Sequence, residues 1–153
     1  MKFLPLCFLS CLLLNQTVAQ DWTAIRHALG QIESGNNDHA RGRAGEVSRY
    51  QILPAVWAAS ATANMGTAQR KLRPTNEADA WLVTRTILAR RIAAFTASHN
   101  GRAPSPREIY ALWNAPAALQ RGGYAALSRA ARSRCERFAN LMAVQQAKGL
   151  AGK

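Results

Sequence analysis

One carboxyl group in this sequence stands where a proton donor would be useful. Glu33 ends an amphipathic stretch whose apolar residues recur at helical spacing, and Ser34 and Gly35 follow it directly. A carboxyl at the C-terminal end of a helix and beside an apolar stripe is disfavoured as an anion, because desolvation and the negative end of the helix dipole both oppose its charge. Such an acid stays protonated near neutral pH and suits general acid catalysis. The alternative is a solvated surface glutamate without a catalytic role.

A polar connector follows Glu33 and leads into another helical pattern. Small and polar residues fill 34–38, a basic Gly-rich piece fills 41–45, and Val47 to Ile52 can form a short extended segment before Pro54 opens the next helix. An acid, a polar hairpin and a new helix in this order predict a cleft. Glu46, thirteen residues after Glu33, is the main candidate for a second carboxylate there, and Asp38 is the other nearby acid.

Two ordered motifs resemble the signature of the soluble lytic transglycosylase and goose-type lysozyme superfamily. The first consists of Glu33-Ser34-Gly35, Gly45, Gln51-Ile52-Leu53-Pro54 and Trp57. The second, Ala111 to Ala115, is similar to the family's Tyr-Asn-Ala-Gly motif. The resemblance extends over residues 22–57 and 109–115. It implies a lysozyme-like fold and cleavage of the β-1,4 bond between N-acetylmuramic acid and N-acetylglucosamine in peptidoglycan.

The resemblance also implies a mechanism with a single catalytic glutamate and no cofactor. In the family this residue protonates the glycosidic oxygen, the substrate's N-acetyl group stabilises the cation, and the same residue deprotonates the 6-hydroxyl to give a 1,6-anhydro-muramyl end. Glu33 matches that position. The family usually has a small residue where Glu46 stands, and its Gly-Leu-Met-Gln is Ser48-Arg49-Tyr50-Gln51 here. Since glycosidases commonly use two carboxylates, a hydrolase in which Glu46 holds a water molecule remains open.

Three residues of the connector are predicted substrate contacts. Gln51 offers an amide to an N-acetyl group, and Tyr50 offers a ring to a sugar face, with packing inside the hairpin as the alternative for Tyr50. Ser48 is either a contact of the substrate or of the catalytic carboxyl, or a turn serine.

The second motif and the residue before it supply three more predicted contacts, which are Tyr110, Trp113 and Asn114. By resemblance, Asn114 keeps the family's asparagine, Trp113 replaces its tyrosine, and Pro116 stands where the family has glycine. The missing phenol removes a hydrogen-bonding group near the catalytic glutamate. Tyr110, one helical turn earlier on the same face, is the residue that can supply it.

Local signals predict the helices that must position these residues. Asp21 and Asn76 are N-cap residues. Ser105 and Glu108 form a capping box, and Pro106, directly after Ser105, fits the first turn of the helix. The resulting helices span 22–34, 54 to about 66, 77–98, about 106–115 and 125–148, with a loop over 67–74. We therefore expect a mostly α, lysozyme-like single domain over 20–149, with a small β-hairpin or extended lobe near 38–52 and a frayed tail over 150–153.

The N-terminal residues predict export. Lys2, the apolar run Phe3 to Leu14 and the small residues of Thr17-Val18-Ala19 form a secretory signal peptide over 1–19, which directs the protein to the periplasm or outside the cell. A lipoprotein anchored at Cys11 is the alternative. No later apolar run approaches the length of a membrane span, so none is expected in the mature chain.

The composition of the chain narrows the classes of binding partner. Twenty Lys and Arg residues against eight Asp and Glu give a formal charge of +12, which favours an acidic polymer such as the anionic cell wall. No motif supports nucleic-acid binding. The histidines lack the spacing of metal ligands, so neither a metal nor a cofactor is expected. Cys135 is alone in the mature chain and is interpreted as a structural thiol. We expect a monomer that binds peptidoglycan glycan strands.

Two rivals to the transglycosylase remain open at this stage. One is a two-carboxylate hydrolase, either a lysozyme or an enzyme directed at chitin or chitosan. The other is a non-catalytic wall-binding or secretion-accessory module, for which the acid Glu33 would have no use.

Overall fold

The computed structural model describes residues 20–68 and 70–151, and these residues are mostly helical, as expected. Their elements are α1 (Trp22–Ser34), α2 (Pro54–Ala68), α3 (Glu77–Ser98), α4 (Pro106–Asn114), α5 (Pro116–Gly122), a 3-10 turn η1 (Tyr124–Ala126) and α6 (Arg129–Ala151). The signal peptide expected over 1–19 lies outside the described residues. None of the described helices has the length and apolarity needed to span a bilayer.

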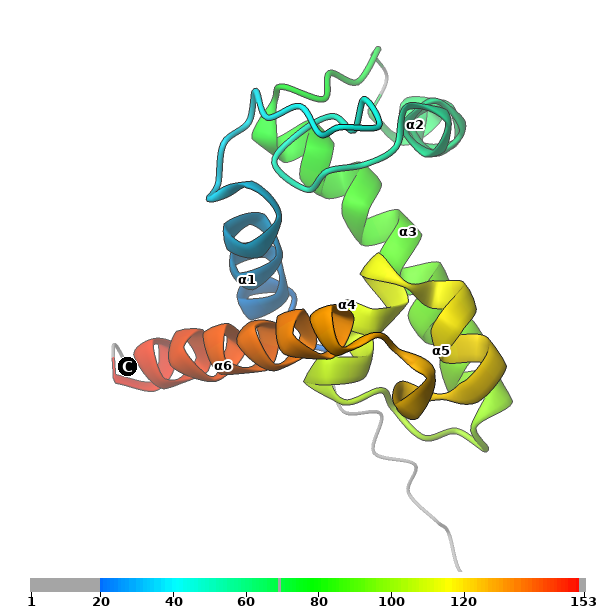
Figure 1. Ribbon diagram of the computed structural model, residues 1–153. Helices are drawn as coiled ribbons and strands as arrows, with labels where there is room; N and C mark the ends of the chain where they lie inside the picture. Colours follow the sequence, from blue (N-terminus) through cyan, green and yellow to red (C-terminus); the bar gives the residue numbers. More distant parts are fainter. Residues whose placement is uncertain (1–19, 69, 152–153) are drawn as a thin grey trace, which may run out of the picture.

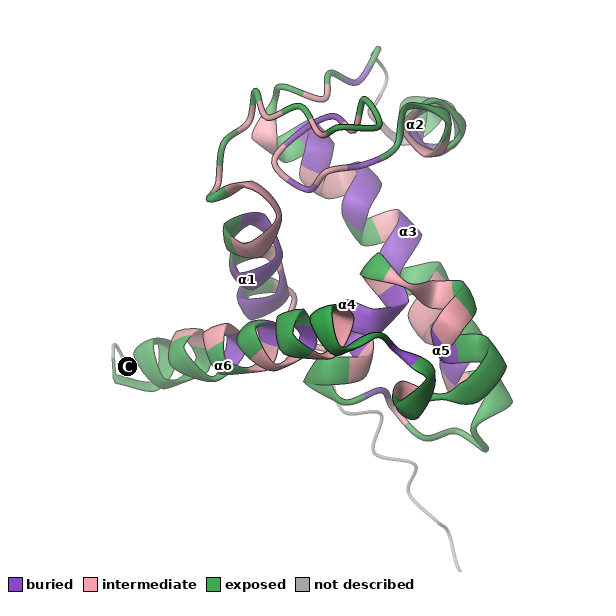
Figure 2. Cartoon of the chain, viewed as in Figure 1, coloured by how far each residue is buried: buried purple, intermediate pink, exposed green. Residues whose placement is uncertain are grey.

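The long helix α3 connects the two ends of the molecule. Figure 1 shows α2 and the connector between α1 and α2 at one end of α3, and α5 at the other. α6 packs against α1 and α4, and α2 packs against α3. Figure 2 shows buried residues on α1, along α3 and where α6 meets its neighbours, while the C-terminal part of α6 is mostly exposed.

The helix ends follow from local capping. Asp21 accepts a 2.9 Å hydrogen bond from the backbone N–H of Ala24, and Gly35 ends α1 in the left-handed conformation, with φ of 65°. Asn76 caps α3 in the same way, and Ser105 opens α4 with the predicted capping box. The predicted beginnings of α1, α2, α3 and α4 are confirmed, as is the end of α3.

The core consists of the apolar faces of these helices. Ile25 and Leu29 of α1, Val83 and Leu88 of α3, and Phe138 of α6 are at most 1% exposed. Burial of such side chains contributes roughly 1.5–3 kcal/mol each. This core holds α6 against α1 and α4.

The connector differs from the extended piece predicted over Val47 to Ile52. Val47 and Ile52 exchange both backbone hydrogen bonds, at 2.8 and 2.9 Å, so the chain between them closes into a tight turn. Ser48 and Gln51 adopt positive φ angles of 69° and 52° to make that turn. Within the described residues the lobe over 38–52 contains isolated bridges, Arg41 to Val47 and Val47 to Ile52, in place of a hairpin ladder.

The C-terminal third also differs in detail. Pro116 opens the separate helix α5, because a proline fits the first turn of a helix. The helix predicted over 125–148 is divided into η1 and α6 by Leu127, whose backbone is extended. α6 continues to Ala151, so the tail expected to fray from residue 150 is helical over its described part. Earlier in the chain, α2 continues to Ala68, which is two residues into the loop predicted over 67–74.

Candidate functional site

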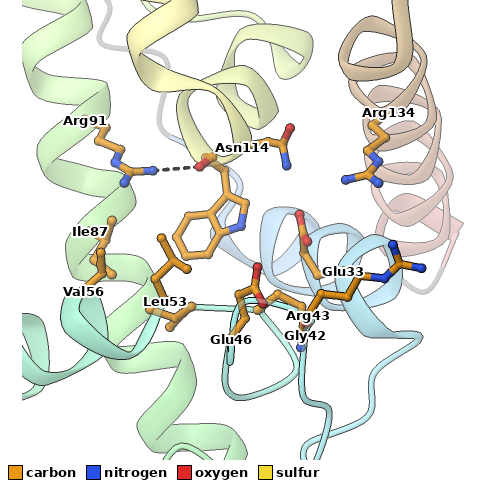
Figure 3. Close-up of a pocket in the computed structure, with 13 residues that line it drawn as sticks. Glu33, Gly42, Arg43, Glu46, Leu53, Val56, Ile87, Arg91, Asn114 and Arg134 are labelled. Carbon is orange, nitrogen blue, oxygen red and sulfur yellow. Dashed lines mark hydrogen bonds between the residues drawn. The ribbon is translucent and has the colours of Figure 1, made fainter. Parts of the chain in front are cut away.

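A pocket of about 450 Å³ lies where the connector meets the ends of several helices. Figure 3 shows Glu33 and Glu46 among the side chains that line it. The lining comes from α1, the connector, α2, α3, α4 and α6: Glu33, Gly42, Arg43, Glu46, Gln51, Ile52, Leu53, Val56, Ile87, Arg91, Trp113, Asn114 and Arg134. Five residues predicted from the sequence, Glu33, Glu46, Gln51, Trp113 and Asn114, are therefore brought together here.

Glu33 sits in the last turn of α1, directly before the residues that end the helix. Its side chain is largely buried, and burial is the main reason why its pKa is raised above 4.5. A hydrogen bond from Tyr110 and the positive charge of Arg134 lower that pKa in part, and the negative charge of Glu46 raises it further. The net effect keeps a proton on Glu33 at a higher pH than on a solvated glutamate.

Tyr110 supplies the phenol expected beside the acid. Its hydroxyl donates a 2.9 Å hydrogen bond to Oε1 of Glu33 across 77 residues of sequence, so the predicted contact is confirmed. Tyr110 is 0% exposed and packs against Phe138, with ring centroids 5.5 Å apart. A role as a direct substrate contact is therefore wrong in this structure, because the ring has no access to the pocket. Burial and the charge of Glu33 raise the pKa of Tyr110, which keeps its hydroxyl a donor.

Glu46 is held on the connector side of the pocket. Its Oε2 accepts a 2.8 Å hydrogen bond from the backbone N–H of Ala44. A Cβ atom at Gly42 would lie 2.1 Å from Oε2 of Glu46 and 2.7 Å from Oε1 of Gln51. Glycine at position 42 thus leaves the space that both side chains occupy.

Of the three connector residues predicted to contact substrate, only Gln51 lines the pocket. Tyr50 is 0% exposed, and its hydroxyl donates a 2.9 Å hydrogen bond to Glu77 at the start of α3. Ser48 is 2% exposed, and its Oγ accepts from the backbone N–H of Tyr50 at 3.2 Å. The two direct-contact predictions are corrected: the tight turn directs Tyr50 into the core, and Ser48 is a turn serine.

Ser34 connects the end of α1 to this turn. Its hydroxyl donates to the backbone carbonyl of Arg49 at 2.9 Å and accepts from the N–H of Asn37 at 3.0 Å. Arg49 also makes two hydrogen bonds to Asp38, at 2.6 and 2.9 Å. Asp38 therefore holds the connector in place and, unlike Glu46, does not line the pocket.

Arg91, which was not predicted from the sequence, positions the second motif. Its guanidinium donates to the carbonyls of Leu112 and Trp113 at 2.8 and 2.9 Å and lies 5.7 Å from the centre of the Trp113 ring. A cation is favourable there, because the last carbonyls of a helix lack partners and carry its negative dipole end. Figure 3 shows Arg91 at the edge of the pocket, with a hydrogen bond marked from its guanidinium. The available signal was spacing: Arg91 lies three residues after Leu88 and four before Phe95, both buried on α3.

Arg43 and Arg134 also line the pocket without having been predicted. Arg134 belongs to α6. It lies four residues before the buried Phe138, a spacing that places both on one side of the helix.

In the described part of the chain, no group of three His, Cys, Asp or Glu side chains is arranged to hold a metal ion. Comparison of the chain with protein-family models, with curated proteins and with solved structures finds no match.

Proposed function

We propose that this protein is an exported enzyme that cleaves the β-1,4 bond between N-acetylmuramic acid and N-acetylglucosamine in peptidoglycan, as a lytic transglycosylase. The observation that carries the proposal is the environment of Glu33: a largely buried carboxyl with a raised pKa, fixed by Tyr110 and facing a pocket. A general acid for glycoside cleavage needs this combination of a retained proton and access to the leaving oxygen.

The proposed reaction uses Glu33 twice. Its proton passes to the glycosidic oxygen as the bond from that oxygen to C1 breaks, and the carbonyl oxygen of the substrate's own N-acetyl group bonds to C1. Glu33, now ionised, takes the proton of the 6-hydroxyl, whose oxygen attacks C1 and releases the N-acetyl group. Tyr110 stabilises the ionised form between these steps, because its hydroxyl donates to Oε1.

The remaining pocket residues fit the binding of a sugar chain. Trp113 offers an apolar face, while Asn114 and Gln51 offer amide groups to hydroxyl and N-acetyl groups. Arg91 fixes the end of α4 that carries Trp113 and Asn114. In this proposal Arg91 and Tyr110 are positioning residues, and Glu33 is the catalytic residue.

A two-carboxylate hydrolase is the second candidate, because Glu46 lines the same pocket as Glu33. In that mechanism Glu46 positions or deprotonates a water molecule that attacks C1. The products then end in reducing sugars in place of anhydro-muramyl groups.

Digestion of purified sacculi, with the products identified by mass spectrometry, tests the proposal. We expect anhydro-muramyl ends from the parent, no release by Glu33→Gln, and a modest loss with Glu46→Gln. Glu136→Gln is the matched control, because Glu136 pairs with Arg107 outside the pocket. Reducing ends together with an inactive Glu46→Gln variant would establish the hydrolase. Sedimentation with sacculi in the absence of any cleavage would instead identify a wall-binding module.

A further inference from the structure

Two arginines in the pocket carry charges that the protein itself leaves without a carboxylate partner. Arg43 and Arg134 are exposed and form no ion pair with any acidic side chain in residues 20–68 and 70–151. Figure 3 shows both on the Glu33 side of the pocket, with Arg91 on the opposite side. Arg91 differs because its Nη1 already donates to two carbonyls at the end of α4. The pocket therefore presents two available guanidinium groups beside the acid.

The position of Arg134 has an electrostatic cost for the free enzyme. Its charge lowers the pKa of Glu33 and so opposes the protonated form that general acid catalysis needs. Glu33 takes its hydrogen bond from Tyr110 and forms no ion pair with Arg134, whose side chain is exposed and lines the pocket. A carboxylate bound to Arg134 would neutralise this charge and remove the effect.

This inference rests on the proposed function. We propose that Arg43 and Arg134 bind a carboxylate of the glycan substrate, so that the pocket selects strands containing muramic acid over neutral polymers of N-acetylglucosamine. Guanidinium groups bind carboxylates through paired, charge-assisted hydrogen bonds. The carboxylate has two possible sources, the lactyl ether of a peptide-free muramic acid and the stem peptide attached to it. A strand of N-acetylglucosamine carries neither.

Calorimetric titration on the Glu33→Gln background tests this without turnover. The probes are a peptide-free tetrasaccharide of alternating N-acetylglucosamine and N-acetylmuramic acid, the same tetrasaccharide bearing stem peptides, and chitotetraose. We expect at least one carboxylate-bearing probe to bind about tenfold or more tightly than chitotetraose, the size of one charge-assisted hydrogen bond. The double change Arg43→Gln and Arg134→Gln should reduce that preference to about twofold or less.

The matched control is the double change Arg129→Gln and Arg137→Gln, which removes the same charge from exposed positions of α6 outside the pocket. It should keep the preference. Preference for the peptide-free probe alone identifies the lactyl carboxylate as the source, and preference for the peptide-bearing probe alone identifies the stem peptide. Equal binding of all probes by the parent, or an unchanged preference in the Arg43 and Arg134 double variant, overturns the inference.

The outcomes also separate this inference from the proposed function. If the protein prefers carboxylate-bearing probes but releases no products from sacculi, the proposed function is refuted and this inference is supported. If the protein digests sacculi while the Arg43 and Arg134 double variant keeps the preference, only this inference is refuted. Failure to bind any of the three probes overturns this inference, and the digestion of sacculi still decides the proposed function.

Discussion

Replacing Glu33 with glutamine should abolish activity and also stabilise the fold at neutral pH. The amide has nearly the same shape and can still accept the hydrogen bond from Tyr110, which is 2.9 Å from Oε1 in the parent. It does not ionise, so the folded protein no longer holds a buried charge. Loss of general acid catalysis lowers the rate by about 10²–10⁴-fold. Lysis by Glu33→Gln at more than about a tenth of the parent rate would refute the assignment.

The sign of the stability change follows from the raised pKa of Glu33. Below the unfolded value of 4.5 the carboxyl is protonated in both states, and its contribution to stability is fully present. As pH rises from there through the folded pKa, the unfolded state loses its proton first, and stability is lost because the folded state must hold the charge against desolvation. Glutamine avoids this loss, so its advantage grows with pH over that window.

The magnitude follows from two opposing contributions. Desolvation of a buried polar group costs roughly 1–3 kcal/mol, and more if it is charged, while the hydrogen bond from Tyr110 returns a part. We expect Glu33→Gln to be more stable by about 1 kcal/mol near neutral pH, which raises the melting temperature by about 2–5 °C for a chain of this size. Thermal melts of both proteins between about pH 4 and pH 8 provide the measurement. Equal melting temperatures at the upper pH, or a difference that stays constant across the range, would contradict the desolvation account.

Three further changes test other parts of the site. Tyr110→Phe removes a hydrogen bond that favours ionised Glu33, so the basic limb of the pH–activity profile should move to higher pH; an unmoved limb would show that the contact does not tune the acid. Arg91→Gln leaves carbonyls at the end of α4 without their partners, so the free energy of unfolding measured in urea should fall by about 1–3 kcal/mol. Sugar binding beside Trp113 should also weaken. The control Arg90→Gln, at an exposed neighbouring position, should change neither quantity. Binding to whole sacculi should weaken as salt rises, because exposed charges are screened beyond about 8 Å at physiological ionic strength, and sedimentation that does not change with salt would show the basic surface to be incidental.

The helix boundaries were accessible from the sequence because capping is local. The side chain of Asn76 accepts from the backbone N–H of Asp79, and Ser105 and Glu108 each accept from the backbone N–H of the other, so every contact lies within three residues. The same holds for Asp21 and for the glycine that ends α1. These signals depend on a few neighbouring residues, so distant parts of the chain do not alter them.

The two buried tyrosines show where local patterns stop being informative. Tyr50 and Tyr110 are both 0% exposed, and each donates a 2.9 Å hydrogen bond to a glutamate. Tyr50 reaches Glu77 at the start of α3, and Tyr110 reaches Glu33 at the pocket. The direction of Tyr50 depends on the positive-φ turn that contains it, and nothing in the spacing of residues 47–52 distinguishes that turn from an extended strand.

The sequence by itself determined the mostly helical fold and the capped helix ends, because each depends on residue types a few positions apart. It also indicated Glu33 as the candidate acid, through a resemblance that extends over two separate motifs. The tertiary structure decided which charges face that acid. Arg91 belongs to α3 and Arg134 to α6, and both reach the pocket only because α3 runs past the end of α4 and α6 packs across α1 and α4. Which face of a helix meets a given pocket depends on packing between segments far apart in the chain, and a periodic pattern within one segment does not contain that information.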